Sequence, residues 1–411
     1  MSSRKGRAIA AAAAAALGVG ALLAPAANAA NPVIVVWADI SKVDGIKAIA
    51  AGYSAADVQV VNKANLKDSV DALKDAEGAP DLVVSAHDWI GGQSANGIIV
   101  KLSVPAQTKA QFPAAVYNAF NYGGDQYGVP LSVENIAWVQ NTKIMGTKCP
   151  ATLDAALATI AAYEKKTGKK LAEKISVPGN DPYHFFPLAS GLGAFVFGTN
   201  DDGSLNPKSV GFDNPTFLKN VKKYLPVWQK SGLFSNFAGK GAGQSGWDPK
   251  NNYASQKSAV IFTGPWFSAQ VEALKFKSVF CAFPQIVKGI TSRPFSGVQG
   301  LTVTKFADAH GVDAAAKAFV NFATTAANDT LYAKTANVLP ANKAAKAPNS
   351  TLQGYANAGA NSLPMPNIPQ MNSVWGFMSQ GWAKSLAKTN PTDPIKSWKD
   401  ASQNIRDAIK G

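Results

Sequence analysis

After its first thirty residues the chain alternates strand-like with helix-like segments. Residues 33–37 are a short β-branched run that predicts a buried strand, and residues 58–61 and 81–86 predict two more. Helices are expected between these strands, from about residue 43 to 53 and over 66–76. Strands joined in this way by helices form a sheet between helical layers, so the predicted fold class is α/β with a doubly wound first part. With 411 residues the chain is too long for one ordinary core, and two compact lobes are expected.

The first residues predict a secretory signal peptide over 1–29. A basic start is followed by an apolar run rich in alanine and leucine, and Ala27-Asn28-Ala29 matches an A-x-A cleavage site. We therefore expect an exported, extracytoplasmic protein, in the periplasm, at the cell surface or secreted. Cys149 and Cys281 are the only cysteines. An oxidising compartment favours a disulfide between them, and two buried thiols are the alternative.

The formal net charge of +14 raises the question of nucleic acid or a membrane surface as partner. The lysines are spread singly, with short pairs such as Lys165-Lys166 and Lys222-Lys223, and no dense basic helix is present in the sequence. The charge therefore indicates a solvated basic surface, and we expect no nucleic-acid partner.

Polar side chains follow the first and third expected strands. Asp39, Ser41 and Lys42 come after the first, and Asp88 and Trp89 follow the third. Open α/β sheets bind ligands beyond the carboxyl ends of their strands. A carboxylate accepts hydrogen bonds from sugar hydroxyls, and an indole ring covers an apolar sugar face, so this pairing suits a polyhydroxylated ligand. The alternative is a helix-capping Asp88 beside a packed Trp89.

At the start of residues 178–187 two prolines and a glycine, Pro178, Pro182 and Gly179, predict a rigid loop. Asp181, Tyr183 and His184 lie in it, followed by two phenylalanines. We expect these rings to be exposed, because four neighbouring rings cannot all be buried on one face. Exposed aromatic side chains in a rigid loop are typical of binding sites.

Two more candidates lie beside expected strands. Glu134 interrupts an apolar run just before the strand expected at 136–141. It is either a charge on an edge strand or a carboxylate that faces a cleft. Trp266 follows the strand expected at 257–262, in Thr263-Gly264-Pro265-Trp266.

The segment 365–371 is the stiffest part of the C-terminal region. Prolines flank Asn367-Ile368, so it predicts an extended or turn-rich lead-in. A helix expected over 373–386 follows and carries Trp375 and Trp382. We hypothesise that the lead-in directs Trp375 at a ligand; the alternative is an ordinary packed terminal helix.

Chemistry that would indicate catalysis, a metal or a cofactor is missing from the sequence. The three histidines are scattered, no His/Cys spacing matches a zinc site, and there is no G-x-S-x-G elbow. The glycine-rich residues 237–247 lack the Lys-Ser/Thr pair of a phosphate loop. Asp88, Glu134 and Asp181 could supply the carboxylate pair of a glycoside hydrolase. Their alternation with aromatic residues favours reversible binding, and we expect no enzyme.

Several motifs match, in order and spacing, a known family across nearly the whole chain. The chain resembles the maltose/maltodextrin-binding protein family, the extracytoplasmic sugar-binding proteins of ABC importers. The shared pieces are residues 365–371 with Trp375, Ala86-His87-Asp88 with Gly91-Gly92, Val133-Glu134, Asp181-Pro182-Tyr183, Gly264-Pro265-Trp266, and Arg293-Pro294-Phe295 with Gly297-Val298.

The resemblance implies a two-lobed periplasmic-binding-protein fold with a hinged cleft between two α/β domains. The N-terminal lobe is then expected over residues 30–131 and 299–342, and the C-terminal lobe over 132–298 and 343–411. It also implies a monomer that delivers maltose, a maltodextrin or a related sugar to a membrane permease. A surface carbohydrate adhesin is the remaining alternative.

The resemblance also assigns roles to the candidate residues. Hydroxyl-binding residues would be Lys42, Asp88, Glu134 and Asp181, stacking residues Tyr183, Trp266 and Trp375, and secondary candidates Asp39, Ser41, Trp89 and His184. The chain departs from maltose-binding protein where Ser85 replaces a tryptophan, Trp89 an arginine, Gly376 a tyrosine and Ser379 an arginine. These departures predict a rearranged subsite, which argues against maltose itself but not against an oligosaccharide or disaccharide.

Overall fold

The computed structural model describes residues 31–177, 181–201, 204–234, 252–387 and 389–410. The expected signal peptide and the glycine-rich residues 237–247 lie outside the described residues. The fold is mixed α/β, as predicted, with Pro32–Gly411 forming one compact unit. None of the described helices is long and apolar enough to cross a membrane.

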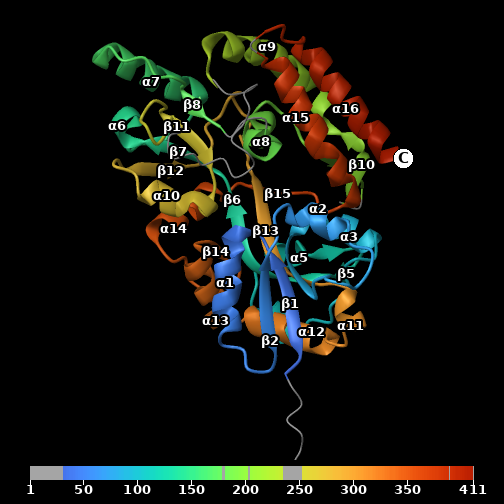
Figure 1. The fold of residues 1–411 in the computed structure, drawn as a ribbon. Coiled ribbons are helices and arrows are strands. Elements are labelled where there is room, and N and C mark those ends of the chain that lie inside the picture. The colour runs from blue at the N-terminus through green and yellow to red at the C-terminus, as the bar shows by residue number, and fades with distance from the viewer. Residues whose placement is uncertain (1–30, 178–180, 202–203, 235–251, 388, 411) are drawn as a thin grey trace, which may run out of the picture. The chain divides into compact units, whose positions relative to one another are not determined.

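The larger sheet has seven strands in the order β14-β6-β13-β3-β1-β2, with β15 paired to β13 (Figure 1). Its strands are β1 (Val33–Ala38), β2 (Asp57–Asn62), β3 (Leu82–Ala86), β6 (Gly128–Asn135), β13 (Phe295–Val303), β14 (Leu339–Pro340) and β15 (Leu363–Pro364). Strand β1 lies between β2 and β3 and is parallel to both, whereas β13 is antiparallel to β3 and β6. The predicted doubly wound opening is therefore correct.

A second sheet has four strands in the order β12-β7-β11-β8. They are β7 (Ala137–Asn141), β8 (Ile175–Ser176), β11 (Val260–Thr263) and β12 (Ser278–Cys281). Two small pairs complete the strands, β4 (Asn121–Tyr122) with β5 (Asp125–Gln126) and β9 (Phe197–Thr199) with β10 (Leu205–Val210). A disulfide joins Cys149 to Cys281 on β12, with the Cα atoms 5.6 Å apart.

The helices follow the capping signals of the sequence. Asn214 begins α9 by accepting a hydrogen bond from the Phe217 N–H, and Gly232 ends it in the left-handed conformation. Helices α15 and α16 run side by side, as do α1 and α13 (Figure 1). The helices between β1 and β6, and between β13 and β14, are α1 (Ile40–Ala50), α2 (Leu66–Asp71), η1 (His87–Trp89), α3 (Ile90–Ala95), α4 (Ala106–Lys109), α5 (Ala114–Asn118), α11 (Phe306–Ala309), α12 (Asp313–Ala323) and α13 (Ala326–Ala336). The others are α6 (Thr142–Met145), α7 (Leu153–Thr167), α8 (Pro182–Gly191), η2 (Gly211–Asp213), α9 (Pro215–Ser231), η3 (Pro265–Phe267), α10 (Ser268–Glu272), α14 (Ser350–Ala358), η4 (Pro369–Ser373), α15 (Val374–Ser385) and α16 (Pro394–Lys410).

Two large apolar cores correspond to the two sheets. One packs β1, β3, β6 and β13 against α1, α12 and α13. The other packs β7 and β11 against α7, α8, α9, α15 and α16. The boundaries predicted between lobes, at 131/132 and 298/299, fall inside β6 and β13. They remain a prediction.

One expectation about local structure is wrong. The aromatic segment after residue 181 is not a loop but helix α8, in which His184, Phe185 and Phe186 are buried and Tyr183 is half-buried. Pro182 occupies the first turn, where its missing N–H costs nothing, and Asp181 caps the helix. The helix packs into the second core, which buries Phe185 and Phe186 and partly covers Tyr183.

Candidate functional site

Strand pairing brings the polar candidates of the first sheet to one corner. Strands β1 and β3 are parallel neighbours, so the residues that follow them, Lys42 and Asp88, emerge at the same edge. Strand β13 carries Gln299 opposite Ala86 and Gly297 opposite Glu134. A Cβ atom on Gly297 would lie 2.9 Å from Glu134 Cγ, so glycine leaves room for the carboxylate.

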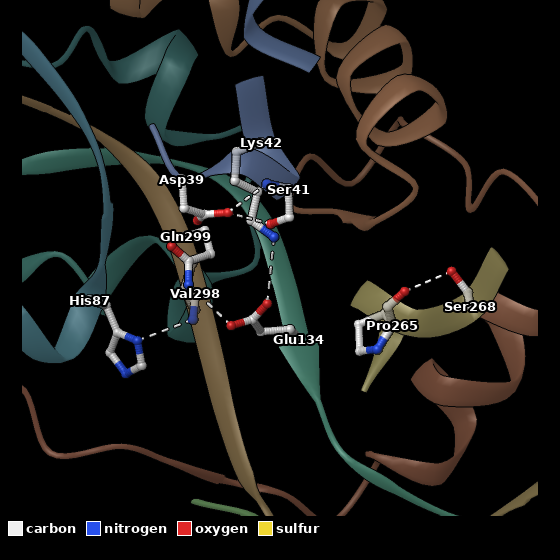
Figure 2. Close-up of polar contacts among 9 residues, drawn as sticks. All are labelled: Asp39, Ser41, Lys42, His87, Glu134, Pro265, Ser268, Val298 and Gln299. Carbon is white, nitrogen blue, oxygen red and sulfur yellow. Dashed lines mark hydrogen bonds and ion pairs between the residues drawn. The ribbon is translucent and has the colours of Figure 1, made fainter. Parts of the chain in front are cut away.

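Glu134 is the centre of the polar contacts at this corner (Figure 2). Its Oε2 lies 3.9 Å from the Lys42 Nζ, and its Oε1 accepts a hydrogen bond of 3.1 Å from the Gln299 amide. Lys42 is only 3% exposed, and this carboxylate is the partner of its buried ammonium group. Glu134 therefore belongs to a polar cluster, and is not an isolated edge-strand charge.

Asp39 and Ser41 are engaged with each other. Asp39 Oδ1 accepts hydrogen bonds from the Ser41 N–H and hydroxyl, which makes Asp39 the N-cap of α1 (Figure 2). Helix α1 consequently begins at Ile40, three residues earlier than expected. The contacts of this pair stabilise the helix end that carries Lys42.

Asp88 lies in the 3-10 turn η1, directly after β3, and is buried. Its pKa is raised to about 7, mainly by burial; a backbone hydrogen bond and the charge of Lys67 lower the pKa, and the charge of Glu134 raises it. The alternative of a side-chain helix cap is not observed at η1 or α3. Trp89 is half-buried against the apolar cluster that contains Ile90 and Phe120.

Aromatic candidates of the second core form one continuous group of rings. The ring centroid of Tyr183 lies 6.1 Å from that of Trp266 and 6.1 Å from that of Phe295. The ring of Trp375 lies edge-on to Phe295, with 5.7 Å between the centroids. His184 lies 5.8 Å from Trp266 and is nearly perpendicular to it. Phe295, which was not among the predicted site residues, is the ring that links Tyr183 with Trp375.

Tyr183 connects the aromatic group to the polar corner electrostatically. Burial raises the pKa of Tyr183 well above its ordinary value, and the charges of Glu134, Asp181 and Asp88 raise it further. Carboxylates from both the polar corner and helix α8 therefore contribute to the raised pKa of one phenol.

The position of Trp266 is set by its own turn. Its ring lies over Gly264, where a Cβ atom would approach the Trp266 Cη2 to 2.3 Å. The buried Ser268 hydroxyl closes the turn by donating a hydrogen bond of 2.6 Å to the Pro265 carbonyl (Figure 2). Asn337, at the end of α13, donates in turn to the Ser268 hydroxyl.

The lead-in at 365–371 is fixed against the first sheet. His87 donates from Nε2 to the Met365 carbonyl and accepts at Nδ1 from the Val298 N–H, each at 3.1 Å. Burial lowers the pKa of His87 to about 4, which keeps its ring neutral. The Gly91 N–H donates to the Asn367 carbonyl at 3.0 Å, and a Cβ on Gly91 would meet that oxygen. His87 was not among the predicted site residues, although its place beside Asp88 could have indicated a structural role.

A pocket of about 490 Å³ lies apart from the candidate site. It is lined by α10, the following turn, β12 and Thr351, and it includes none of the candidate residues. The described ranges contain no group of three or more His, Cys, Asp or Glu side chains that could hold a metal ion.

Comparison with known proteins adds a family and a fold. Residues 44–360 match the model of the bacterial extracellular solute-binding protein family. The galactooligosaccharide-binding protein of Bacillus subtilis (strain 168) is 27% identical over 92% of this chain and 89% of its own length. The maltodextrin-binding protein MdxE of the same organism is 25% identical over 73% of this chain and 71% of its own.

A solved structure gives the same answer for the fold. The crystal structure of a cyclo/maltodextrin-binding protein complexed with maltotetraose superimposes with a TM-score of 0.75 at 23% identity, covering 93% of this chain and 99% of that one. This confirms the predicted periplasmic-binding-protein fold.

Proposed function

Because the chain belongs to the bacterial extracellular solute-binding protein family, we propose that it captures an oligosaccharide outside the membrane and delivers it to the permease of an ABC importer. The family consists of binding proteins, not enzymes. The observation that carries the proposal is the position of Tyr183. Its ring lies 6.1 Å from that of Trp266 between centroids, and the charges of Glu134 and Asp88 contribute to the raised pKa of its phenol. Rings beside carboxylates are the chemistry that a sugar requires.

Each group of residues has a distinct role in this proposal. Asp88 and Glu134 accept hydrogen bonds from sugar hydroxyls, and the Lys42 ammonium donates to a sugar oxygen. Trp375 and Trp266 cover the apolar faces of successive rings. Both indoles are half-buried, so each retains surface for a ligand. Trp89 is a further ring beside Asp88, where it can form a subsite of its own.

Transport requires that the bound and free forms differ. We propose lobes over residues 30–131 with 299–342 and 132–298 with 343–411, hinged where β6 and β13 pass between them. A sugar held by both groups of residues favours the closed form, because only that form makes both sets of contacts. The permease then recognises the closed surface of a monomer.

Support for an oligosaccharide comes from the relatives and the departures from maltose-binding protein. One relative is named for galactooligosaccharide and another for maltodextrin. Ser85 removes one ring and Trp89 adds another beside Asp88. We therefore include both maltodextrins and galacto-oligosaccharides among the ligands to test.

A calorimetric panel tests the proposal. Maltose, maltotriose, maltotetraose, galactobiose and galactotriose are titrated into the mature protein, and reducing-sugar release is assayed in parallel. We expect one-to-one binding of at least one oligosaccharide without hydrolysis, and a smaller radius of gyration in solution scattering when it is bound. Absence of heat with every sugar would contradict the proposal.

A further inference from the structure

Both carboxylate oxygens of Asp181 are occupied within its own helix turn. Oδ1 accepts a hydrogen bond of 2.9 Å from the Tyr183 N–H and thereby caps α8. Oδ2 lies 2.6 Å from His184 Nδ1. Asp181 was expected to bind sugar hydroxyls, but its geometry serves the helix end and the imidazole ring.

The contact with Asp181 selects one form of His184. A carboxylate oxygen can only accept, so His184 Nδ1 carries the proton. In the neutral ring the other nitrogen, Nε2, is then a hydrogen-bond acceptor. A carboxylate that fixes the tautomer and direction of a histidine is a common way to prepare the opposite nitrogen for a ligand.

His184 Nε2 has no hydrogen-bond partner among the described residues, although the side chain is only 2% exposed. The hydroxyl of the adjacent Tyr183 also has no hydrogen-bond partner among the described residues. Leaving a buried polar atom unpaired is unfavourable, because the atom loses its hydrogen bonds to water and gains none in the protein. Both rings belong to the aromatic group, His184 being 5.7 Å from Tyr183 and 5.8 Å from Trp266. Two unsatisfied polar atoms therefore lie among the rings that are candidates for sugar stacking.

We propose that His184 Nε2 accepts a hydrogen bond from a hydroxyl of the bound oligosaccharide, that the Tyr183 hydroxyl pairs with the same sugar unit, and that Asp181 is a positioning residue which acts through His184. This inference rests on the proposed function and deepens it. It makes the site selective for a sugar unit that carries a free hydroxyl at this position. A site with buried polar groups rejects an analogue that lacks the matching hydroxyl, because those groups then stay unpaired.

Calorimetry on three variants separates contact from positioning. Maltotriose and galactotriose are titrated into the wild type, His184→Phe, Asp181→Asn and the double variant. His184→Phe keeps the ring volume, and we expect about a tenfold loss of affinity from the missing hydrogen bond. Asp181→Asn keeps the helix cap and should lose less. The double variant should lose no more than His184→Phe, since Asp181 has no contact of its own with the sugar.

The outcomes distinguish this inference from the proposed function. If the wild type binds neither sugar nor any other member of the panel, both fail. If the wild type binds and His184→Phe binds equally well, this inference alone is overturned. Additive losses in the double variant would instead make Asp181 a direct sugar contact. His310→Asn, outside the aromatic group, is the matched control and should bind like the wild type.

Nitrogen NMR of the histidine-labelled protein gives a readout that does not depend on folding of a variant. The chain has three histidines. The hydrogen bonds predict a proton on Nδ1 of His184, a neutral ring protonated at Nε2 for His87, and protons on both nitrogens of His310, which face Asp81 and the Ala76 carbonyl. Sugar should shift the His184 Nε2 resonance and leave His310 unchanged. A proton on His184 Nε2 in the free protein would contradict the inference.

Discussion

The two groups of residues at the candidate site are built on different principles. The corner of the seven-stranded sheet supplies charged groups: Lys42 and Asp88 are buried, and the half-buried Glu134 pairs with Lys42 and accepts a hydrogen bond from Gln299. The second core supplies rings, Trp266 and Trp375 among them, which are half-buried and held by packing. The disulfide, between Cys149 and Cys281, lies in the part of the chain that contains the second core.

The difference follows from the energetics of burial. A buried charge must be paired before any ligand arrives, because an unpaired one is costly, so the polar corner depends on hydrogen bonds between strands. An aromatic ring is held by packing alone, and a short turn or a helix end is sufficient to support it. Four predictions test this contrast, beginning with the largest expected effect.

The Cys149–Cys281 disulfide should make a large contribution to the stability of the part of the chain that contains the second core. Replacing Cys149 and Cys281 by serine removes a crosslink between residues 132 positions apart. We expect the free energy of unfolding to fall by about 2–5 kcal/mol. Urea denaturation of the variant and of the wild type, with and without reductant, measures this. Identical midpoints for oxidised and reduced wild type would contradict the prediction.

Trp375 tests the aromatic half of the comparison. Its ring is half-buried and rests against Phe295. Trp375→Ala should weaken oligosaccharide binding by about 1–3 kcal/mol, the usual cost of losing an aromatic anchor. Trp375→Phe, which keeps a ring, is the matched control and should lose less. Unchanged affinity in the alanine variant, measured calorimetrically, would make Trp375 a core residue only.

Asp88 tests the polar half through pH. Its pKa is raised to about 7 by burial, so the free protein holds a proton there below neutrality. A sugar hydroxyl that donates to the carboxylate requires the ionised form, and binding then releases that proton. Affinity should therefore fall as pH drops below about 7, by at most about tenfold per pH unit.

Two variants control the pH experiment. Asp88→Asn should flatten the dependence of affinity on pH. Asp329 also has a pKa of about 7 because of burial, but its carboxylate accepts from the Asn342 N–H outside the candidate site. Asp329→Asn should leave the pH dependence of binding unchanged. A flat profile in the wild type would remove Asp88 from the proposed contacts.

His310 should give the smallest effect, on stability alone. Its Nδ1 donates to Asp81 and its Nε2 to the Ala76 carbonyl, and the bond to Asp81 is the main cause of its raised pKa. Because its pKa is raised in the folded state, the protonated ring stabilises the fold fully at pH values below the unfolded pKa near 6.5. This stabilisation is lost as the pH rises through the folded-state pKa. His310→Asn should cost about 0.5–1 kcal/mol at pH 5.5 and less at pH 8.5. Thermal unfolding at both pH values measures this, and an equal cost at both would contradict it.

Local patterns predicted most strands correctly. The β-branched run at 33–37 became β1, and the helix expected over 373–386 became α15. Helix α1 begins three residues before the predicted start, because the Asp39 side chain caps it. The helix α8 was missed although an aspartate followed by a proline is a helix-start signal.

Long-range contacts could not be predicted from local pattern. The bond from His87 to the Met365 carbonyl joins residues 278 positions apart, and only the fold brings them together. The same is true of Phe295 as the link between Tyr183 and Trp375. Spacing predicted which residue types lie near strand ends, but not which of them are already engaged with one another.

A calorimetric series with one sugar tests the central claim, that a single ligand is bound by both groups of residues. The best ligand of the panel is titrated into the wild type, Glu134→Gln, Trp375→Ala and the double variant. We expect one-to-one binding in the wild type, a loss in each single variant and the largest loss in the double variant. Wild-type affinity in either single variant would show that one group of residues does not contact the sugar, and would contradict the account.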